Sequence, residues 1–343
     1  MDKRMTLALF ILVLLILGGY ILGTANDVAV PSQSTIAEQK DSEDSVANTA
    51  DGVVTNASPD RDDEKRANLN MLVSTDSGIR RKALAELALE LSKSPPMATG
   101  KYTTYGDDLL PVLGHVIADL DDPYAHNAVE ATFYLAMVNQ SRANADSLGL
   151  DASTRAELEK LSHYPRPSSY QPMKSALTTA LTESRNDEVR HWAALALANG
   201  FEPTQEIEAI LASQLPREID NRKVGPAIIG ALSELAERHN LQTSTQAAIL
   251  NGLESSDNTT RRTAAKFIGK HRVDGGLQAL FEQIPTSGDV RTLRMMLDSV
   301  VSIGVTRAGD MAELERMAAE EQEDELKIEI LSALERLQGT GAR

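Results

Sequence analysis

Residues 187–200, DEVRHWAALALANG, decide the fold of this chain. Their apolar side chains fall at positions i, i+3, i+4, i+7 and i+8, which is the spacing of an α-helix with one apolar face. The acidic opening of this segment recurs along the chain, with spacings of 33, 37, 32 and 35 residues between Asp187, Asp220, Asp257, Asp289 and Asp324. The sequence therefore predicts one helical unit that is copied several times.

Each copy pairs this helix with a shorter amphipathic helix that precedes it, such as the stretch around Ile207 and Leu211. Earlier copies begin near Asp76 and at Asp122, where Asp122 is expected to cap the helix and Pro123 to be its first residue. About seven helix pairs result. Because such a pair cannot bury its apolar faces alone, neighbouring pairs must stack. The predicted fold is all-α, an α-α superhelix over residues 61–338.

The acidic opening, the Ala- and Leu-rich helix and the unit length resemble the HEAT-repeat family of armadillo-like α-solenoids, particularly its short bacterial form. Tetratricopeptide repeats need a Trp in every unit, whereas this chain has one, and armadillo units are longer. The resemblance implies a ladder of charges between neighbouring units. Its expected members are Arg190, Arg261 or Arg262, Arg291 and Lys327, with Asp187, Asp257, Asp289 and Asp324 opposite. No arginine follows Asp122 in this pattern, so the ladder is expected to lapse there.

The composition excludes several classes of function. The chain has 343 residues and a net charge of -16, and this charge repels a polyanion, so nucleic acid is not an expected partner. It contains no cysteine, which removes disulfides, thiolate zinc sites and cysteine nucleophiles. Aromatic residues make up only 4% of the chain, so its core must consist of Leu, Ala, Ile and Val.

An apolar run near the amino terminus predicts a membrane anchor. Residues 5–23 carry no charge, and Lys3 and Arg4 precede them, so we expect a single-pass anchor (residues 1–25) with its amino terminus in the cytoplasm. A signal peptide cleaved after Ala25 is the alternative, and both interpretations export the remainder. Residues 26–60 read as a disordered acidic linker and residues 339–343 as a tail. The expected location is the inner membrane, with the solenoid in the periplasm.

Two stretches break the repeat. The larger, an insertion at residues 141–172, includes an expected short helix over residues 153–161, followed by HYPRPSSY at residues 163–170. The smaller covers residues 93–106. Insertions in solenoids emerge as surface loops, often on the binding face. The alternative is that both segments are plain connectors.

No catalytic or metal-binding pattern is found in the sequence. Its histidines form no paired metal spacing, and the acidic run at residues 320–325 reads as solvated helix-start charge. We expect no cofactor, no metal site and no enzymatic activity. The histidines are His115, His126, His163, His191, His239 and His271.

The favoured hypothesis is a membrane-anchored, non-catalytic scaffold that binds a protein or peptide partner in the cell envelope. An accessory lyase or prosthetic-group-handling enzyme is the alternative, which His163, Tyr164 and Arg166 in a deep cleft beside a carboxylate would support. A third interpretation is a plain spacer between membrane and wall. The candidate partner-binding residues are polar positions of the second helices and of the insertion: Tyr124, His126, Tyr164, Arg166, Tyr170, Arg190, His191, Arg222, Arg262, Arg291 and Arg294.

Overall fold

The computed structural model describes residues 61–92, 103–144, 152–159, 164–304, 308–321 and 323–340. Over these residues the regular elements are helices, and no strand occurs, so the all-α prediction is confirmed for this part of the chain. The chain divides into two compact units, Met1–Asn68 and Leu69–Arg343. Only the second is described below, apart from the bounds of the helix α2 (Arg61–Leu72) that begins in the first. The predicted anchor and linker lie outside the described residues.

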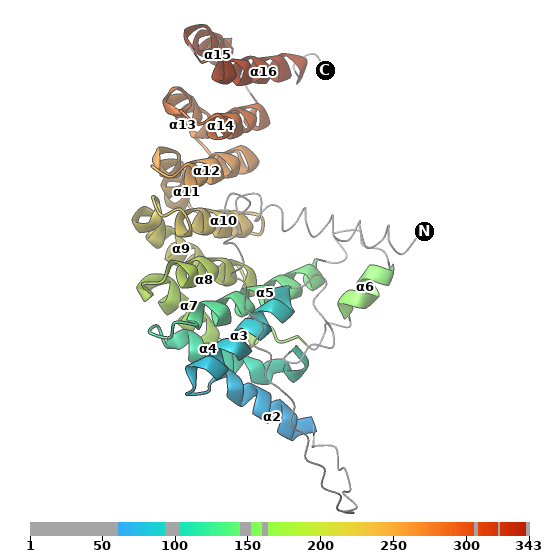
Figure 1. Ribbon diagram of the computed structural model, residues 1–343. Helices are drawn as coiled ribbons and strands as arrows, with labels where there is room; N and C mark the ends of the chain where they lie inside the picture. Colours follow the sequence, from blue (N-terminus) through green and yellow to red (C-terminus); the bar gives the residue numbers. More distant parts are fainter. Residues whose placement is uncertain are drawn as a thin grey trace, which may run out of the picture. The chain divides into compact units, whose positions relative to one another are not determined.

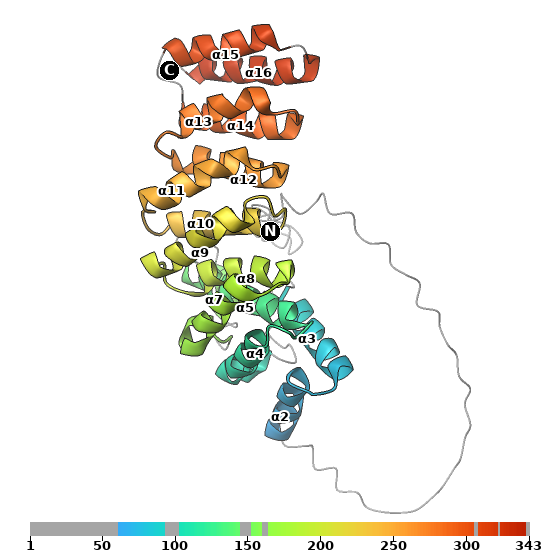
Figure 2. The same ribbon diagram turned by 90° about the vertical axis from the view of Figure 1, so that its left-hand side faces the viewer.

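The second unit is a stack of antiparallel helix pairs, each formed by a first and a second helix. Figure 1 shows the pairs from α7/α8 in green to α15/α16 in red lying one above another. The view in Figure 2 shows the same order from the side. The pairs are α4 (Leu109–Ala118) with α5 (Ala125–Ala143), α7 (Gln171–Glu183) with α8 (Asp187–Gly200), α9 (Gln205–Glu218) with α10 (Val224–Ala236), α11 (Thr243–Leu250) with α12 (Asn258–His271), α13 (Gly276–Gln283) with α14 (Val290–Ile303), and α15 (Ala308–Glu320) with α16 (Asp324–Thr340).

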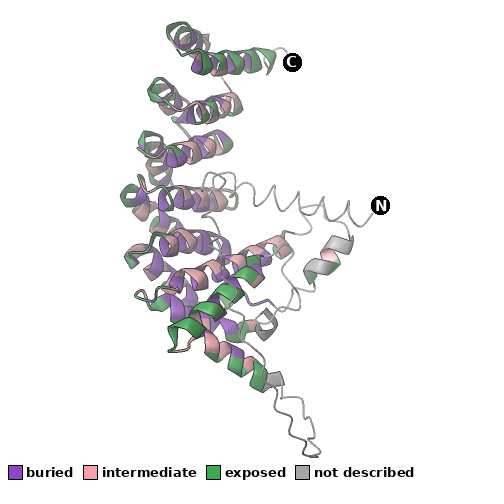
Figure 3. Cartoon of the chain, viewed as in Figure 1, coloured by how far each residue is buried: buried purple, intermediate pink, exposed green. Residues whose placement is uncertain are grey.

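The second helices form a continuous layer of their own. Each packs on the next, in the order α3 (Ser77–Ser92), α5, α8, α10, α12, α14 and α16. Their buried residues are mostly Leu, Ala, Ile and Val, and Figure 3 shows burial concentrated where these helices face their neighbours. Full burial of a Leu side chain contributes roughly 1.5–3 kcal/mol, so the stacked faces supply most of the driving force for folding.

Polar caps set the starts of α8, α12 and α14, as the repeat predicts. The carboxylates of Asp257 and Asp289 accept hydrogen bonds from the backbone N–H groups of Thr260 and Thr292, both at 2.8 Å. In α8 the cap is Asn186, one residue before the expected Asp187. Each such cap contributes about 0.5–2 kcal/mol.

The start of α5 differs from the prediction. The helix begins at Ala125, and Pro123 lies in the turn before it. The cause is Asp122, whose side chain is 2% exposed and forms an ion pair with Arg80 of the preceding unit at 3.0 Å. Its other oxygen accepts from the backbone N–H of Tyr124 at 2.8 Å, which closes a turn instead of capping a longer helix.

Two further predictions concern the insertion and the termini. The short helix expected over residues 153–161 is present as α6 (Ala152–Glu159), and a 3-10 turn, η2 (Pro167–Ser169), leads into α7. The helix α16 runs to Thr340, into the region predicted as a tail. Among the described helices none has the length and apolarity to cross a membrane; residues 5–23 are not part of that set.

Candidate functional site

A set of arginines joins neighbouring second helices at equivalent positions. Arg80 in α3 and Arg190 in α8 each donate to a backbone carbonyl just before their own helix, those of Ser74 and Ser184, at 3.0 and 2.9 Å. Each also forms an ion pair with the following unit. Arg261 in α12 repeats the contact to the preceding carbonyl. The charge ladder expected from the repeat is therefore present in part: Arg262 pairs with Asp289 as predicted, whereas Arg190 pairs between units with Glu218, which was not predicted.

The ladder differs from the prediction in α14. There Arg294 donates to Glu329 of α16 at 3.0 Å, an inter-unit contact that the prediction did not include. Asp122 does not end the ladder on its incoming side, because it receives Arg80. The expected lapse is present in the helix that follows Asp122, since α5 carries Glu130 at the position of Arg190 in α8.

Glu130 is a half-buried carboxylate next to an aromatic cluster. Burial raises the pKa of Glu130 above its usual 4.5; the hydrogen bond from Tyr134 opposes this shift and the charge of Glu188 adds to it. The Tyr134 hydroxyl donates to Glu130 at 3.3 Å. The rings of Phe133, Tyr134 and Trp192 then pack between α5 and α8, with Phe133 and Trp192 5.2 Å apart. This cluster replaces the missing ladder contact with aromatic packing.

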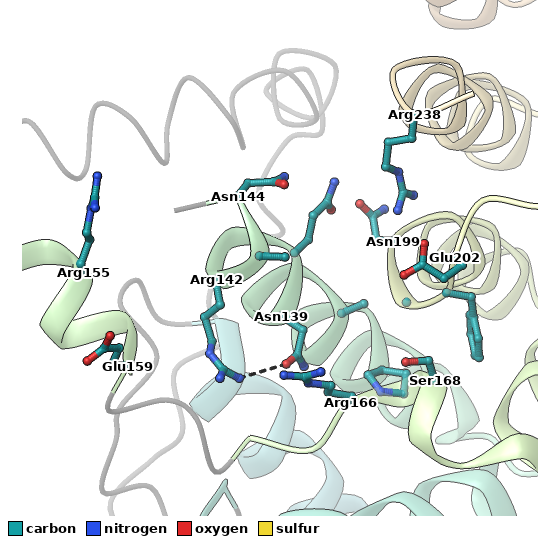
Figure 4. Close-up of a pocket in the computed structure, with 16 residues that line it drawn as sticks. Asn139, Arg142, Asn144, Arg155, Glu159, Arg166, Ser168, Asn199, Glu202 and Arg238 are labelled. Carbon is teal, nitrogen blue, oxygen red and sulfur yellow. Dashed lines mark hydrogen bonds between the residues drawn. The ribbon is translucent and has the colours of Figure 1, made fainter. Parts of the chain in front are cut away.

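The main cavity of interest lies where α5, α8 and α10 end, beside the insertion. Its volume is about 570 Å³, within the range typical of ligand pockets. Figure 4 shows Arg142, Asn139 and Arg166 together on one wall, with Asn199, Arg238 and Glu202 on the opposite side. Arg155 and Glu159 reach the cavity from α6. We call this cavity the arginine pocket; the cationic residues that line it are Arg142, Arg155, Arg166 and Arg238.

The two arginines on one wall of the arginine pocket are not neutralised. Arg142 donates to the side-chain oxygen of Asn139 at 3.2 Å, and neither Arg142 nor Arg166 forms an ion pair with a described carboxylate. Burial lowers the pKa of Arg142, and the like charge of Arg166 lowers it further. Two guanidinium groups without a carboxylate partner among the described residues, the partly exposed Arg142 and the exposed Arg166, therefore face the same cavity in a chain whose net charge is -16.

The pocket also holds two buried hydrogen-bond acceptors. Oδ1 of Asn199 and Oε1 of Gln140 have no hydrogen-bond partner among the described residues, and Asn199 is 6% exposed. Asn199 Nδ2 donates to the carbonyl of Leu195 at 2.8 Å, which fixes the amide so that Oδ1 is the atom left over. Leaving such an acceptor buried and unpaired costs about 1–3 kcal/mol. Each of these two oxygens can therefore accept a hydrogen bond that no described residue donates.

On the opposite wall a cation satisfies a helix end. Arg238 of α10 donates to the carbonyl of Ala198, one of the terminal carbonyls of α8. Positive side chains are favourable at this end of a helix, because its last carbonyls carry partial negative charge. Arg238 therefore offsets a local field that would otherwise repel an anionic ligand.

Of the predicted partner-binding residues, Arg166 alone lines the arginine pocket. Arg190 is 7% exposed and paired with Glu218, and Tyr164 is 2% exposed, so neither presents the free surface expected of it. The ring of Tyr170 packs against Gly114 of α4 and holds the insertion in place. His163 lies outside the described residues.

The other predicted residues are spread along the stack and do not come together. Tyr124 and His126 lie at the start of α5, where His126 contacts the carbonyl of Pro123 at 3.2 Å and the guanidinium of Arg81 lies over the ring of Tyr124. His191 contacts the carbonyl of Lys223 at 3.1 Å, and burial lowers its pKa from 6.5. The arginines farther along are the exposed Arg222 before α10, Arg262 paired with Asp289, and Arg291 and Arg294 on α14.

The residues that sequence reasoning missed are Asn139, Arg142, Asn199 and Arg238. One signal was available: Asn139 and Asn199 each lie ten residues after the first buried valine of their helices, Val129 and Val189. Asparagines at equivalent positions of two successive units indicate a row of polar side chains that runs across both units. Among the described residues no cluster of His, Asp and Glu has the arrangement of a metal site.

Comparisons with known proteins give similarity to solved structures alone. No protein-family model matches the chain, and no curated protein matches it. Among solved structures, two engineered proteins are 18% and 17% identical over 81% of this chain, covering 97% and 82% of their own, each with a TM-score of 0.37. A designed armadillo repeat protein is 16% identical over 79% of this chain and 98% of its own, with a TM-score of 0.36. The architecture described above rests on the packing of this chain's own helices.

Proposed function

We propose that this protein is a non-catalytic scaffold that binds a protein or peptide partner in the cell envelope, with the arginine pocket as a principal contact. The observation that carries the proposal is the pair Arg142 and Arg166, two cations that form no ion pair with a described carboxylate and lie on one wall of a cavity of about 570 Å³. Arg166 is exposed and Arg142 partly so, and an acidic group of a ligand can therefore bind them without first displacing a described carboxylate.

The proposal includes an anchor and a repeat type. Residues 5–23 hold the scaffold in the inner membrane, and the repeats are of the short bacterial HEAT kind. The support is the uncharged run behind Lys3 and Arg4, together with the recurring acidic helix starts. Alkaline phosphatase fused after residue 60 should be active, and a fusion of green fluorescent protein at the same place should be dark. The reverse pattern would place the solenoid in the cytoplasm.

Site-specific crosslinking in cells tests the scaffold directly. A photoreactive amino acid in place of Ser168, which lines the arginine pocket, should yield a defined crosslinked protein band. The same residue in place of Gln278, exposed on α13 in the layer of first helices, is the control and should yield none. Crosslinks of equal yield at both positions, or at neither, would contradict the proposal.

A purified full-length chain also separates scaffold from enzyme. The pocket carries two carboxylates, Glu159 and Glu202, so an acid or base role can be examined by replacement of each with Gln. We expect partner crosslinking at position 168 to survive both replacements. Loss of the crosslink in Glu202→Gln alone, with the fold intact, would mean that Glu202 contacts the partner and that the two arginines are not the principal contact.

A further inference from the structure

We propose that the arginine pocket binds an acidic peptide segment in extended conformation, with a carboxylate on Arg142 and Arg166 and a main-chain N–H on the side-chain oxygen of Asn199. This inference rests on the proposed scaffold function and names the chemistry of its partner. Its test is chosen so that the two can fail separately.

Arg142 and Arg166 indicate that the ligand carries an acidic group. Arg142 and Arg166 lie side by side in Figure 4, and the positive charge of Arg166 lowers the pKa of Arg142, so their guanidinium groups interact. Guanidinium groups bind carboxylates through paired, charge-assisted hydrogen bonds. One carboxylate placed between the two arginines would remove their mutual repulsion. A basic ligand would increase it.

The side-chain oxygens of Asn199 and Gln140 indicate that the ligand also carries an N–H donor. Asn199 Oδ1 and Gln140 Oε1 are buried and lack partners among the residues described, and both line the arginine pocket. The hydrogen bond from Asn199 Nδ2 to Leu195 rules out an inverted amide, which would place two oxygens against each other. These atoms can receive hydrogen bonds only. A simple anion has no N–H to give, whereas a peptide backbone offers one at each residue.

The carboxylates of the pocket leave room for this ligand. Glu159 and Glu202 are exposed, and neither is paired with an arginine among the described residues. Arg142 and Arg166 form no ion pair with a described carboxylate, so this wall of the pocket carries positive charge, opposite in sign to the net charge of the chain. This positive charge favours an acidic segment at this place, while the net charge of -16 disfavours it over the remaining surface.

A random heptapeptide library displayed on phage and selected on the full-length protein in lipid nanodiscs tests the inference. We expect the selected peptides to be enriched in Asp and Glu. Arg142→Gln and Arg166→Gln should each weaken the affinity of the best peptide about tenfold or more. Arg222→Gln, an exposed arginine outside the pocket, is the matched control and should leave it within about twofold.

The acceptor half is tested from both sides of the contact. Asn199→Ala should weaken the same peptide about threefold or more, and so should methylation of the peptide nitrogen that faces Asn199, which leaves the protein unchanged. Inorganic phosphate should compete weakly, with a dependence on Arg142 and Arg166 but not on Asn199. Enrichment of neutral or basic peptides, no enrichment, or binding insensitive to both Asn199→Ala and N-methylation would overturn the inference. In that case a partner crosslink at position 168 would still support the proposed scaffold function.

Discussion

At the scale of single residues, the buried ion pair of Arg190 and Glu218 links α8 to the end of α9. The guanidinium lies 3.1 Å from the Glu218 carboxylate, and both side chains are less than a tenth exposed. Breaking a buried pair by removing one partner leaves a charge without compensation. The burial and short distance of this pair, and not the presence of two charges alone, make its loss destabilising.

We therefore expect Arg190→Met to lower the free energy of unfolding by about 3 kcal/mol, measured by urea denaturation. The control is Lys223→Met, which removes the neighbouring but exposed pair with Glu188 and should cost no more than about 1 kcal/mol. Similar losses in the two variants would show that burial does not set the strength of these pairs.

The carboxylate of Glu130 makes stability depend on pH in a defined sense. Because burial raises its pKa above 4.5, the folded state binds a proton more tightly than the unfolded state. Stability contributed by the protonated form is therefore lost as the pH rises through the folded-state pKa. Glu130→Gln should be more stable than the native protein at pH 7, and the difference should vanish below pH 4.5 in thermal melts at several pH values. A constant difference at all pH values would contradict this.

At the scale of elements, close backbone approach fixes the join between α9 and α10. A side chain at Gly225, in the first turn of α10, would place its Cβ 2.6 Å from the carbonyl oxygen of Glu218. At Gly230, farther along the same helix, a Cβ meets nothing within 4 Å. The two glycines therefore have different roles in one element.

Gly225→Ala should destabilise the protein by about 1–3 kcal/mol, because the backbone must shift to admit the methyl group. Gly230→Ala should instead stabilise it by about 0.5–1 kcal/mol, since alanine has the higher helix propensity and no neighbour is displaced. The transition midpoints in thermal denaturation compare the pair directly. Equal shifts in both variants would contradict the packing at this join.

The elements also show how far the sequence alone predicts the structure. The second helices could be predicted because their apolar period and acidic caps are local signals, as in α12 and α14. The contact of Arg294 with Glu329 could not, because it depends on how α14 packs on α16. The start of α5 was wrong for a similar reason: the contact of Asp122 with Arg80 is a tertiary one.

The arginine pocket was out of reach of sequence reasoning for the same cause. Its walls bring together Asn139, Arg166, Asn199 and Arg238, which belong to different units and to the insertion. Spacing along the chain predicts which residues share a helix face, but the depth of a cavity depends on how the insertion packs. Arg166 was predicted from its loop, whereas Arg142 and Arg238 each lie on a helix without any distinguishing pattern.

At the scale of the whole second unit, each pair contacts mainly its neighbours, so stability is approximately a sum of local terms. Leu334 of α16 is 5% exposed and packs at the last pair. Leu334→Ala should cost about 2–5 kcal/mol and speed hydrogen exchange in α15 and α16, while α7 and α8 keep their protection. Exchange followed by mass spectrometry distinguishes this from uniform loss of protection, which would indicate a single cooperative core.

The arginine pocket draws its walls from the ends of α5, α8 and α10, three successive members of one layer. A ligand that touches all three helices would connect two successive interfaces of the stack, α5 with α8 and α8 with α10. The first of these interfaces lacks its ladder arginine, because α5 carries Glu130 at that position. The helices α5, α8 and α10 would then unfold together instead of one at a time. Under mechanical tension these three helices would unfold last. Binding of a partner would therefore itself stabilise the part of the stack that binds it.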